Sequence, residues 1–343
     1  MPRKRAVSPI LMIAFSQKLL GLAHPMHFAR GARLVRQGEA SRGAFLLRSG
    51  RVAAQVALPG GGMLGVAELG EGDVFGEMAL IERGVCSASV VALTDVEALF
   101  IEREEFRAMV ASRDPAALDT QRAITRVLAA KLRALNAKVR EHPAEEDRPA
   151  RETPRVATLD GKEPAFDWRA FLPLLRFFEG FDERDIGEAL AGARALEVPR
   201  GTWLFAAGQP ADRCFVVVRG AVEVLSRLGG LERRVTLAGP GELVGYLAVL
   251  ERANHAASAR VRETAALLDF PGEAFIAAYE GESRLAVKLQ HAIHRSLLRS
   301  LARTNNQLTR LISAARLRGA EAEGRALEAA RGSQVVDLVE QPD

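Results

Sequence analysis

The residues best suited to chemistry lie in the stretch FGEMALIERGVCSASV, residues 75–90. A Phe-Gly-Glu turn leads into a short apolar segment, and a helix starting there would present backbone N–H groups and a positive dipole end to an anion. Small hydroxyl residues follow, but Cys86 stands where a phosphate would require a cation. The candidate ligand contacts are Phe75, Gly76, Glu77, Met78, Ala79, Arg83, Cys86, Ser87 and Ser89. The stretch predicts either a site for a phosphate-bearing ligand or a fold that has kept the loop and lost the ligand.

The composition is typical of a globular protein without a strong charge bias. The 343 residues are 48% hydrophobic and 26% charged, with a formal net charge of +4. Lysines and arginines are scattered among acidic residues, whereas a DNA-binding surface requires a clustered basic face. Cys86 and Cys214 are isolated, so neither a disulfide framework nor a metal knuckle is indicated, and a reducing cytoplasm is expected. Pro9 interrupts the apolar N-terminal run, which argues against a signal peptide or a membrane span.

An internal repeat organises the chain. ELGEGDVFGEMAL (68–80) aligns with LAGPGELVGYLAV (237–249) at an offset of 169 residues, and LRALNAKV (132–139) aligns with LARTNNQL (301–308) at the same offset. A period of this length indicates two domains of one kind rather than a solenoid. The predicted divisions are an N-terminal helical and basic lead (1–24), domain 1 with its trailing helix (25–140), a solvated linker (141–164), domain 2 with a long C-terminal helix (165–318) and a flexible tail (319–343).

Within each domain, glycines separate short β-rich runs such as AFLLRSG and RVAAQVAL. Closure into a jelly-roll barrel of about eight short strands would remove exposed sheet edges, so the predicted class is α+β, mainly β. Each barrel is followed by a helix with an apolar stripe. The stripes consist of Ile124, Leu128, Leu132, Leu135 and Val139, and of Leu297, Leu301, Thr304, Leu308, Leu311 and Ala315. The second helix, predicted from Ser283 to Arg318, exceeds what one barrel can cover, so its far end either forms a homodimer seam or folds back on domain 1.

The glycine spacing, the strand rhythm, the segment Gly-x-x-Phe-Gly-Glu-x-Ala-Leu and the helix behind it resemble the cyclic-nucleotide-binding domain. The chain looks like two such domains in tandem, as in regulatory subunits of cyclic-nucleotide-dependent kinases, over about residues 25–140 and 166–315. The resemblance implies that a short helix holds a cyclic phosphate, that a glutamate accepts the ribose 2′-hydroxyl, and that an arginine at the position of Cys86 pairs with the phosphate. It makes cAMP or cGMP the candidate ligand, and no cofactor is expected.

Both domains depart from this pattern at the charged positions. Domain 1 keeps Glu77 but has Cys86 in place of the arginine, whereas domain 2 has Tyr246 in place of the glutamate and His255 in place of the arginine. The candidate contacts in domain 2 are Gly245, Tyr246, Leu247, His255, Ala256 and Ser258. Loss of a charge-assisted hydrogen bond of about 1.5–3 kcal/mol should weaken phosphate binding by about one to two orders of magnitude.

Two side chains could replace the lost cation. His255 would do so when protonated, a form that a bound anion favours. Arg83 follows the apolar segment, and folding inward would bring its guanidinium into the site. The alternative for Arg83 is a solvated side chain in an exposed ion pair, which base rates favour.

Polar residues of the trailing helices also have two interpretations each. His291 and His294 lie one helical turn apart, a spacing that metals use, but no third ligand accompanies them and surface histidines are favoured. Asn136 and Asn305 share a register, with Thr304 beside the latter. They either read the edge of a purine base or set the pairing of helices.

Two functions follow from these residues. The first is a cytoplasmic, non-catalytic regulator that senses a cyclic nucleotide or related phosphorylated ligand through domain 1 and signals to another protein. The second is a ligand-free assembly scaffold built from degenerate domains. A DNA-binding transcription factor is disfavoured because only about 25 residues follow Arg318, fewer than a helix-turn-helix domain needs. No catalytic motif stands out, so an enzyme is not expected.

Overall fold

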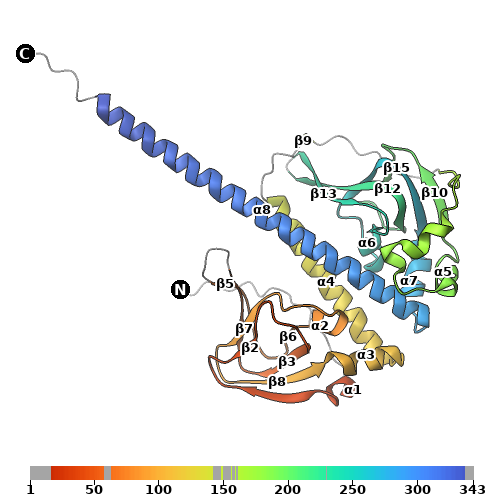
Figure 1. Ribbon diagram of the computed structural model, residues 1–343, viewed down its shortest axis with the longest axis horizontal. Coiled ribbons are helices and arrows are strands. Elements are labelled where there is room, and N and C mark those ends of the chain that lie inside the picture. The colour runs from red at the N-terminus through yellow and green to blue at the C-terminus, as the bar shows by residue number, and fades with distance from the viewer. Residues whose placement is uncertain are drawn as a thin grey trace, which may run out of the picture.

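Two antiparallel β domains, each followed by a long helix, form the computed structural model of the chain (Figure 1). The structure describes residues 17–57, 63–141, 148–149, 156, 159, 161–228 and 230–336. The predicted α+β class, mainly β, with two jelly-roll units in tandem is confirmed.

Domain 1 packs two four-stranded antiparallel sheets, ordered β1-β8-β3-β6 and β2-β7-β4-β5. Its elements are α1 (Gln17–Leu20), β1 (His24–Phe28), β2 (Arg33–Val35), β3 (Gly43–Ser49), β4 (Val52–Ala57), β5 (Met63–Leu69), β6 (Val74–Phe75), α2 (Met78–Ile81), β7 (Ser89–Ala92), β8 (Val96–Glu102), α3 (Arg103–Ala111) and α4 (Pro115–Glu141). In the core between the sheets, the ring of Phe45 stacks on that of Phe75 with centroids 4.9 Å apart. This contact fixes the start of the domain 1 cassette, residues 75–80, to the barrel.

Domain 2 repeats the plan with longer strands. Its elements are η1 (Arg169–Leu174), η2 (Arg176–Phe178), α5 (Glu183–Ala189), β10 (Arg194–Val198), β11 (Trp203–Phe205), β12 (Arg213–Leu228), β13 (Leu231–Ala238), β14 (Leu243–Val244), α6 (Tyr246–Leu250), β15 (Ser258–Pro271), α7 (Gly272–Glu280) and α8 (Arg284–Val336). The sequence predicted only short strands, but β12 runs through Gly220 without a break. Gly220 has φ 84°, and the register of β12 against β15 shifts around it, so a bulge bends the strand instead of ending it. All strands of this domain therefore join one seven-stranded sheet.

Part of the predicted linker belongs to domain 2. Residues Arg148–Pro149 form the short strand β9, which pairs with β13, and Lys162 bridges to Glu197. Leu159 is buried in the domain 2 core. Leu159 and Pro164 are therefore packed, as burial of apolar surface favours, whereas Gly161, Lys162 and Glu163 stay exposed as predicted.

The trailing helices α4 and α8 lie side by side and run in the same direction (Figure 1). The side chains of Gln121 and Gln290 are hydrogen-bonded at 2.7 Å, and a hydrogen bond of 2.5 Å joins Thr125 Oγ1 and His294 Nε2. Both pairs are separated by 169 residues, the offset of the sequence repeat. Equivalent positions of the two copies thus face each other, as they do in a parallel homodimeric coiled coil.

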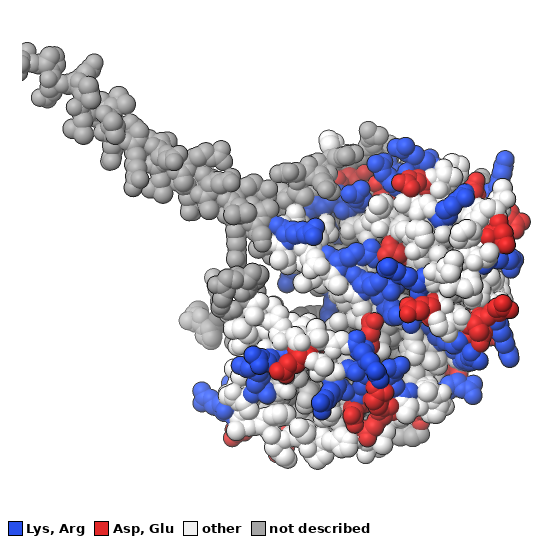
Figure 2. Space-filling model, viewed as in Figure 1, with Lys and Arg blue, Asp and Glu red and all other residues white. Residues whose placement is uncertain are grey.

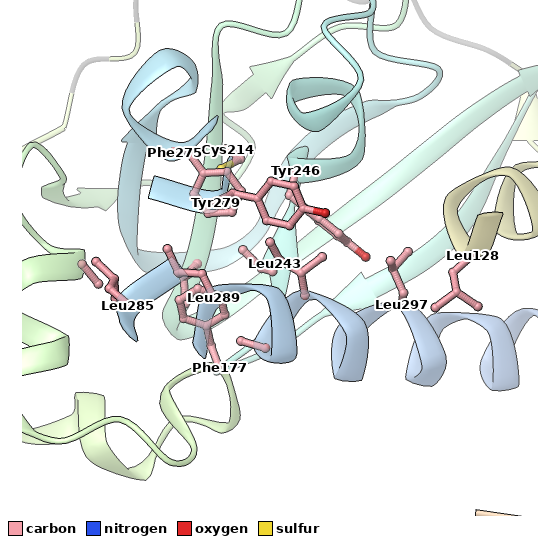
Figure 3. Close-up of a cluster of buried hydrophobic side chains, with 14 of the residues drawn as sticks. Leu128, Phe177, Cys214, Leu243, Tyr246, Phe275, Tyr279, Leu285, Leu289 and Leu297 are labelled. Atoms are coloured by element: carbon pink, nitrogen blue, oxygen red, sulfur yellow. The ribbon is translucent and has the colours of Figure 1, made fainter. Parts of the chain in front are cut away.

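Apolar residues complete this seam. Figure 3 shows Leu297 of α8 beside Leu128 of α4, with Leu289 and Tyr246 further along the same buried cluster. The near half of α8 therefore folds back on domain 1, which is one of the two predicted arrangements. The residues of the second stripe up to Leu308 are buried within the chain, so they are not free to form a homodimer seam.

Helix α8 is longer than the sequence pattern predicts. The helix continues to Val336, beyond the predicted end at Arg318, because its distal segment is rich in alanine, glutamate and arginine, which favour helix even without packing. In the part of the chain that the structure describes, no helix has the length and apolar character needed to cross a membrane.

Candidate functional site

A cavity of about 460 Å³ lies between the domain 1 cassette and the two trailing helices. The barrel, the cassette and the loop after α2 form most of its wall. The lining residues are Val35, Ser41, Ala54, Ala67, Leu69, Val74, Phe75, Gly76, Glu77, Met78, Ala79, Glu82, Arg83, Gly84, Val85, Cys86, Ser87, Ala88, Val90, Lys131 and Leu298. Lys131 comes from α4 and Leu298 from α8, so both helices contribute to the wall. A cavity of this size is in the range of small-molecule sites.

The backbone of the cassette is shaped by Gly76. Its φ of 75° is a left-handed conformation, and a Cβ at this position would come within 2.8 Å of the Gly43 carbonyl oxygen. The turn then uses two of its own amides: the N–H of Ala79 donates to Gly76, and that of Leu80 to Glu77. The amides of Glu77 and Met78 have no acceptor among the described residues. These two N–H groups are therefore available to donate hydrogen bonds to an anionic ligand.

Glu77 joins the cassette to helix α4. Its side chain is buried, with 4% of the residue exposed, and its carboxylate forms an ion pair with the ammonium group of Lys131. Lys131 itself is 46% exposed. A buried carboxylate needs such a partner, because without it the desolvation of the charge would be uncompensated.

Cys86 also lines the cavity and is partly buried. Its backbone is fixed: the Cys86 N–H donates to Glu39 at 2.8 Å, and the Cys86 carbonyl accepts from Gly38 at 2.9 Å. Ser87 and Ala88 follow in the same wall. The main chain around position 86 is thus held as a binding loop, while the thiol brings no positive charge.

In domain 2 the corresponding space is occupied by protein side chains. The rings of His255 and Phe205 stack with centroids 3.7 Å apart, and His255 is 4% exposed. A Cβ at Gly245 would lie 3.0 Å from the Phe205 ring and 3.3 Å from the His255 ring, so the two rings sit against the turn itself. Burial lowers the pKa of His255 to about 4, although nearby Asp212 acts in the opposite direction. His255 is therefore neutral at pH 7 and does not supply the expected cation.

Tyr246 takes the glutamate position of domain 2 and points into the core (Figure 3). Burial raises its pKa to about 12, so the phenol is un-ionised. Its hydroxyl, which lies near Ser296 and Ser300 of α8, has no partner of hydrogen-bonding geometry among the described residues. Leu247 packs against the same core, and Ala256 is exposed. Domain 2 thus has the turn, but a tyrosine replaces the carboxylate and the rings of Phe205 and His255 lie against the turn.

Comparison with known proteins identifies the family of the two domains. The model of the family described as "Cyclic nucleotide-binding domain" matches residues 25–113 and 195–282, which together make up more than half of the chain. The chain belongs to the cyclic nucleotide-binding domain family. The first match contains the turn at Gly76 and the second contains the equivalent turn at Gly245.

Relatives with this domain include two bacterial regulators. The CRP-like cAMP-activated global transcriptional regulator of Mycobacterium tuberculosis is 27% identical over 136 residues, which cover 39% of this chain and 59% of that protein. The cyclic AMP receptor protein of Thermus thermophilus is 36% identical over 83 residues, 24% of this chain and 38% of that protein. The chain thus matches less than two thirds of the length of either relative. A solved structure of the regulatory domain of Toxoplasma gondii PKA with cAMP has 16% identity and a TM-score of 0.30, with 77% of this chain and 84% of that chain covered.

The remaining candidate residues lie outside the cavity or at its rim. Arg83 of the first cyclic nucleotide-binding domain is turned outward: its side chain is 74% exposed and pairs with Glu104 of α3 at 3.3 Å. Ser89 accepts a hydrogen bond from the Gln37 N–H at 3.0 Å and is not part of the cavity wall. Ser258 accepts one from the Ala207 N–H at 2.9 Å in the same way. The two serines therefore stabilise equivalent turns, at Gln37 in domain 1 and at Ala207 in domain 2.

Arg103 has a structural role that sequence analysis missed. This arginine of α3 is buried and donates hydrogen bonds to the carbonyl oxygens of Ala79 and Ser41. It therefore anchors the cassette helix α2 to α3. Its setting in the run Glu-Arg-Glu-Glu favoured a solvated side chain. Lys131 was missed for a similar reason, because a lysine on a helix surface is usually solvated.

Proposed function

We propose that the first cyclic nucleotide-binding domain is a sensor for a cyclic nucleotide or a closely related phosphorylated ligand, and that ligand binding changes the packing of α4 and α8. The observation that carries the proposal is the shared wall of the cavity. An occupant would touch the cassette, Lys131 of α4 and Leu298 of α8 at once. A ligand that fits one helix arrangement better than another shifts the population towards that arrangement.

In this proposal the second cyclic nucleotide-binding domain has a structural role. His255 and Phe205 occupy its ligand space, and Tyr246 removes the carboxylate. Its helix α8 forms part of the domain 1 cavity. Domain 2 thereby supplies half of the element that responds to the ligand.

The output would pass to another protein in the cytoplasm, without a catalytic step in this chain. Figure 2 shows acidic side chains among the basic ones on one face of the molecule. Arg295 of α8 pairs with Glu179 at 3.7 Å. Arg303 likewise pairs with Glu242. Such a mixed face favours a protein partner over DNA. A homodimer remains a proposal that would have to use α8 beyond Leu311.

The proposal is tested by calorimetric titration of the full chain with cAMP, cGMP and cyclic dinucleotides, followed by hydrogen exchange. We expect saturable binding of at least one ligand, weaker than in domains that keep the arginine, with altered exchange of α4 and α8 amides. Binding without any change in these helices would refute the relay, and no heat with any ligand would refute the sensor.

A ligand-free scaffold is the second candidate. Loss of the arginine position in both domains and the filled space in domain 2 favour it. Under this alternative the cavity of domain 1 stays empty in the cell. Purification of the protein with a bound nucleotide, or micromolar binding in the titration above, would exclude it.

A further inference from the structure

Two cations line the domain 1 cavity, and only one of them is paired with a residue of the cassette. The charged lining residues are Glu77, Glu82, Arg83 and Lys131. Arg83 is paired with Glu104, which does not line the cavity. The ammonium group of Lys131 lies instead on the carboxylate of Glu77. Glu77 belongs to the turn whose Glu77 and Met78 amides lack an acceptor among the described residues.

We propose that Lys131 is the phosphate-binding cation of this domain and replaces, from helix α4, the guanidinium that position 86 lacks. The inference rests on the proposed function. An ammonium group has three N–H donors, so Lys131 can contact Glu77 and a second anion together. A phosphate bound to the amides of Glu77 and Met78 would lie next to that carboxylate. Lys131 would then bridge the two anions, and Glu77 would keep an oxygen for a ligand hydroxyl.

Domain 2 provides an internal comparison. At the repeat offset of 169 residues, the position of Lys131 is taken by Ser300 and that of Glu77 by Tyr246. The ligand space there is filled by His255. The ammonium, the carboxylate and the cavity therefore occur together in domain 1 and are replaced together in domain 2. This joint replacement is expected if the three features bind one ligand. An ion pair with a purely structural role could be present whether or not the domain has a cavity.

The position of the cation on α4 has a mechanical consequence. An arginine at position 86 would belong to the barrel and would bind phosphate without involving the helix. Lys131 belongs to the helix whose residues Gln121 and Thr125 contact α8. The charge of the ligand would therefore attract α4 itself towards the cassette and stabilise one arrangement of the seam.

The test compares a charged and an uncharged ligand. The full chain and its variants K131Q, K131R, C86R and K131Q/C86R are titrated with cAMP and with adenosine. K138Q is the matched control, because Lys138 is also an exposed lysine of α4 but does not line the cavity. K131Q should lower the affinity for cAMP by about 10- to 100-fold and that for adenosine by less than about threefold. K131R and K138Q should keep cAMP binding, and C86R should restore it in the K131Q background, which also shows that the variant is folded.

Four results would overturn the inference. Equal affinity of the wild type and K131Q for cAMP would exclude Lys131 from the phosphate site. Equal wild-type affinity for cAMP and adenosine would show that no cation reads the phosphate, while leaving domain 1 a nucleoside-type sensor. Binding of cAMP only after C86R would show that Lys131 cannot replace the arginine. Silence of every variant, C86R included, would refute the proposed function itself.

Discussion

Acidification from pH 7 to pH 5 should weaken the seam between α4 and α8 through one residue, His294. This side chain is fully buried, and its Nδ1 has no hydrogen-bond partner among the described residues. Burial, with smaller contributions from the neighbouring His291 and Arg295, lowers the pKa of His294 from 6.5 to about 3, against a hydrogen bond with the Gln121 backbone that acts to raise it. The imidazole is therefore neutral in the folded protein at both pH values, whereas in the unfolded chain it takes up a proton below pH 6.5.

The sign and size follow from this difference in bound protons. A histidine whose pKa is depressed by folding contributes stability that is fully present above its unfolded pKa and is lost as the pH falls towards the folded value. The contribution changes by about 1.36 kcal/mol for each pH unit. Between pH 6.5 and pH 5 His294 alone should therefore lower the free energy of unfolding by about 2 kcal/mol.

Urea unfolding at pH 7, 6 and 5 measures the effect. The variant T125V/H294L removes both polar partners of the 2.5 Å hydrogen bond, so that neither is left buried without the other. Its loss of stability between pH 7 and pH 5 should be about 2 kcal/mol smaller than that of the wild type. His255 and His291, whose pKa values burial also lowers to about 4, are present in both proteins and largely cancel in the difference.

A matched control is H27Q, because His27 is exposed on β1. This variant should follow the pH dependence of the wild type. If T125V/H294L and the wild type lose stability in parallel, the imidazole of His294 reaches water in solution, and the seam is more open than its burial indicates.

Three further predictions concern the site and the seam. G76A places a Cβ at φ 75° and within 2.8 Å of the Gly43 carbonyl oxygen, so thermal unfolding should show a loss of about 1–3 kcal/mol; an unchanged melting temperature would show that the turn adapts. L298A removes part of the cavity wall that α8 supplies, and titration should show a loss of cAMP affinity of about 3- to 30-fold, with adenosine affected equally. Q290L should cost about 1–3 kcal/mol because it leaves Gln121 buried without its partner, whereas Q121L/Q290L should recover most of this loss; additive losses in the double-mutant cycle would contradict the pairing.

The fold was predictable because its signals are local. Glycines that permit tight turns and short β-rich runs mark the strands, and the cassette around Gly76 is readable because few other sequences combine its turn and helix start. Because the repeat aligns the two domains, each structural prediction for one domain also applies to the equivalent residues of the other. The same local signals located Cys86 and Glu77 in the wall of the cavity.

The partners of side chains were less predictable, because they depend on elements far apart in the chain. His294 was interpreted as a surface histidine, yet it is buried, since its partner Thr125 lies 169 residues away. Thr304 hydrogen-bonds Asn136 at 3.3 Å, which favours helix pairing over recognition of a base. The apolar periodicity of one helix shows which face is buried but does not identify the helix that packs against it. The choice between folding back and dimerisation was therefore open until the two helices were seen together.

The seam also explains how one copy can lose its site while the chain keeps its architecture. In a symmetric dimer of a single domain, filling the ligand space would abolish both sites at once. Here the two halves are separate stretches of one chain, so His255 can fill the space of domain 2 while Cys86 faces a cavity in domain 1. The helices still pair at equivalent positions, with Gln121 against Gln290. Under the proposed function this asymmetry would make a single ligand sufficient: an occupant of domain 1 would contact Leu298 of α8 and so would act on the helices of both domains without a second binding event.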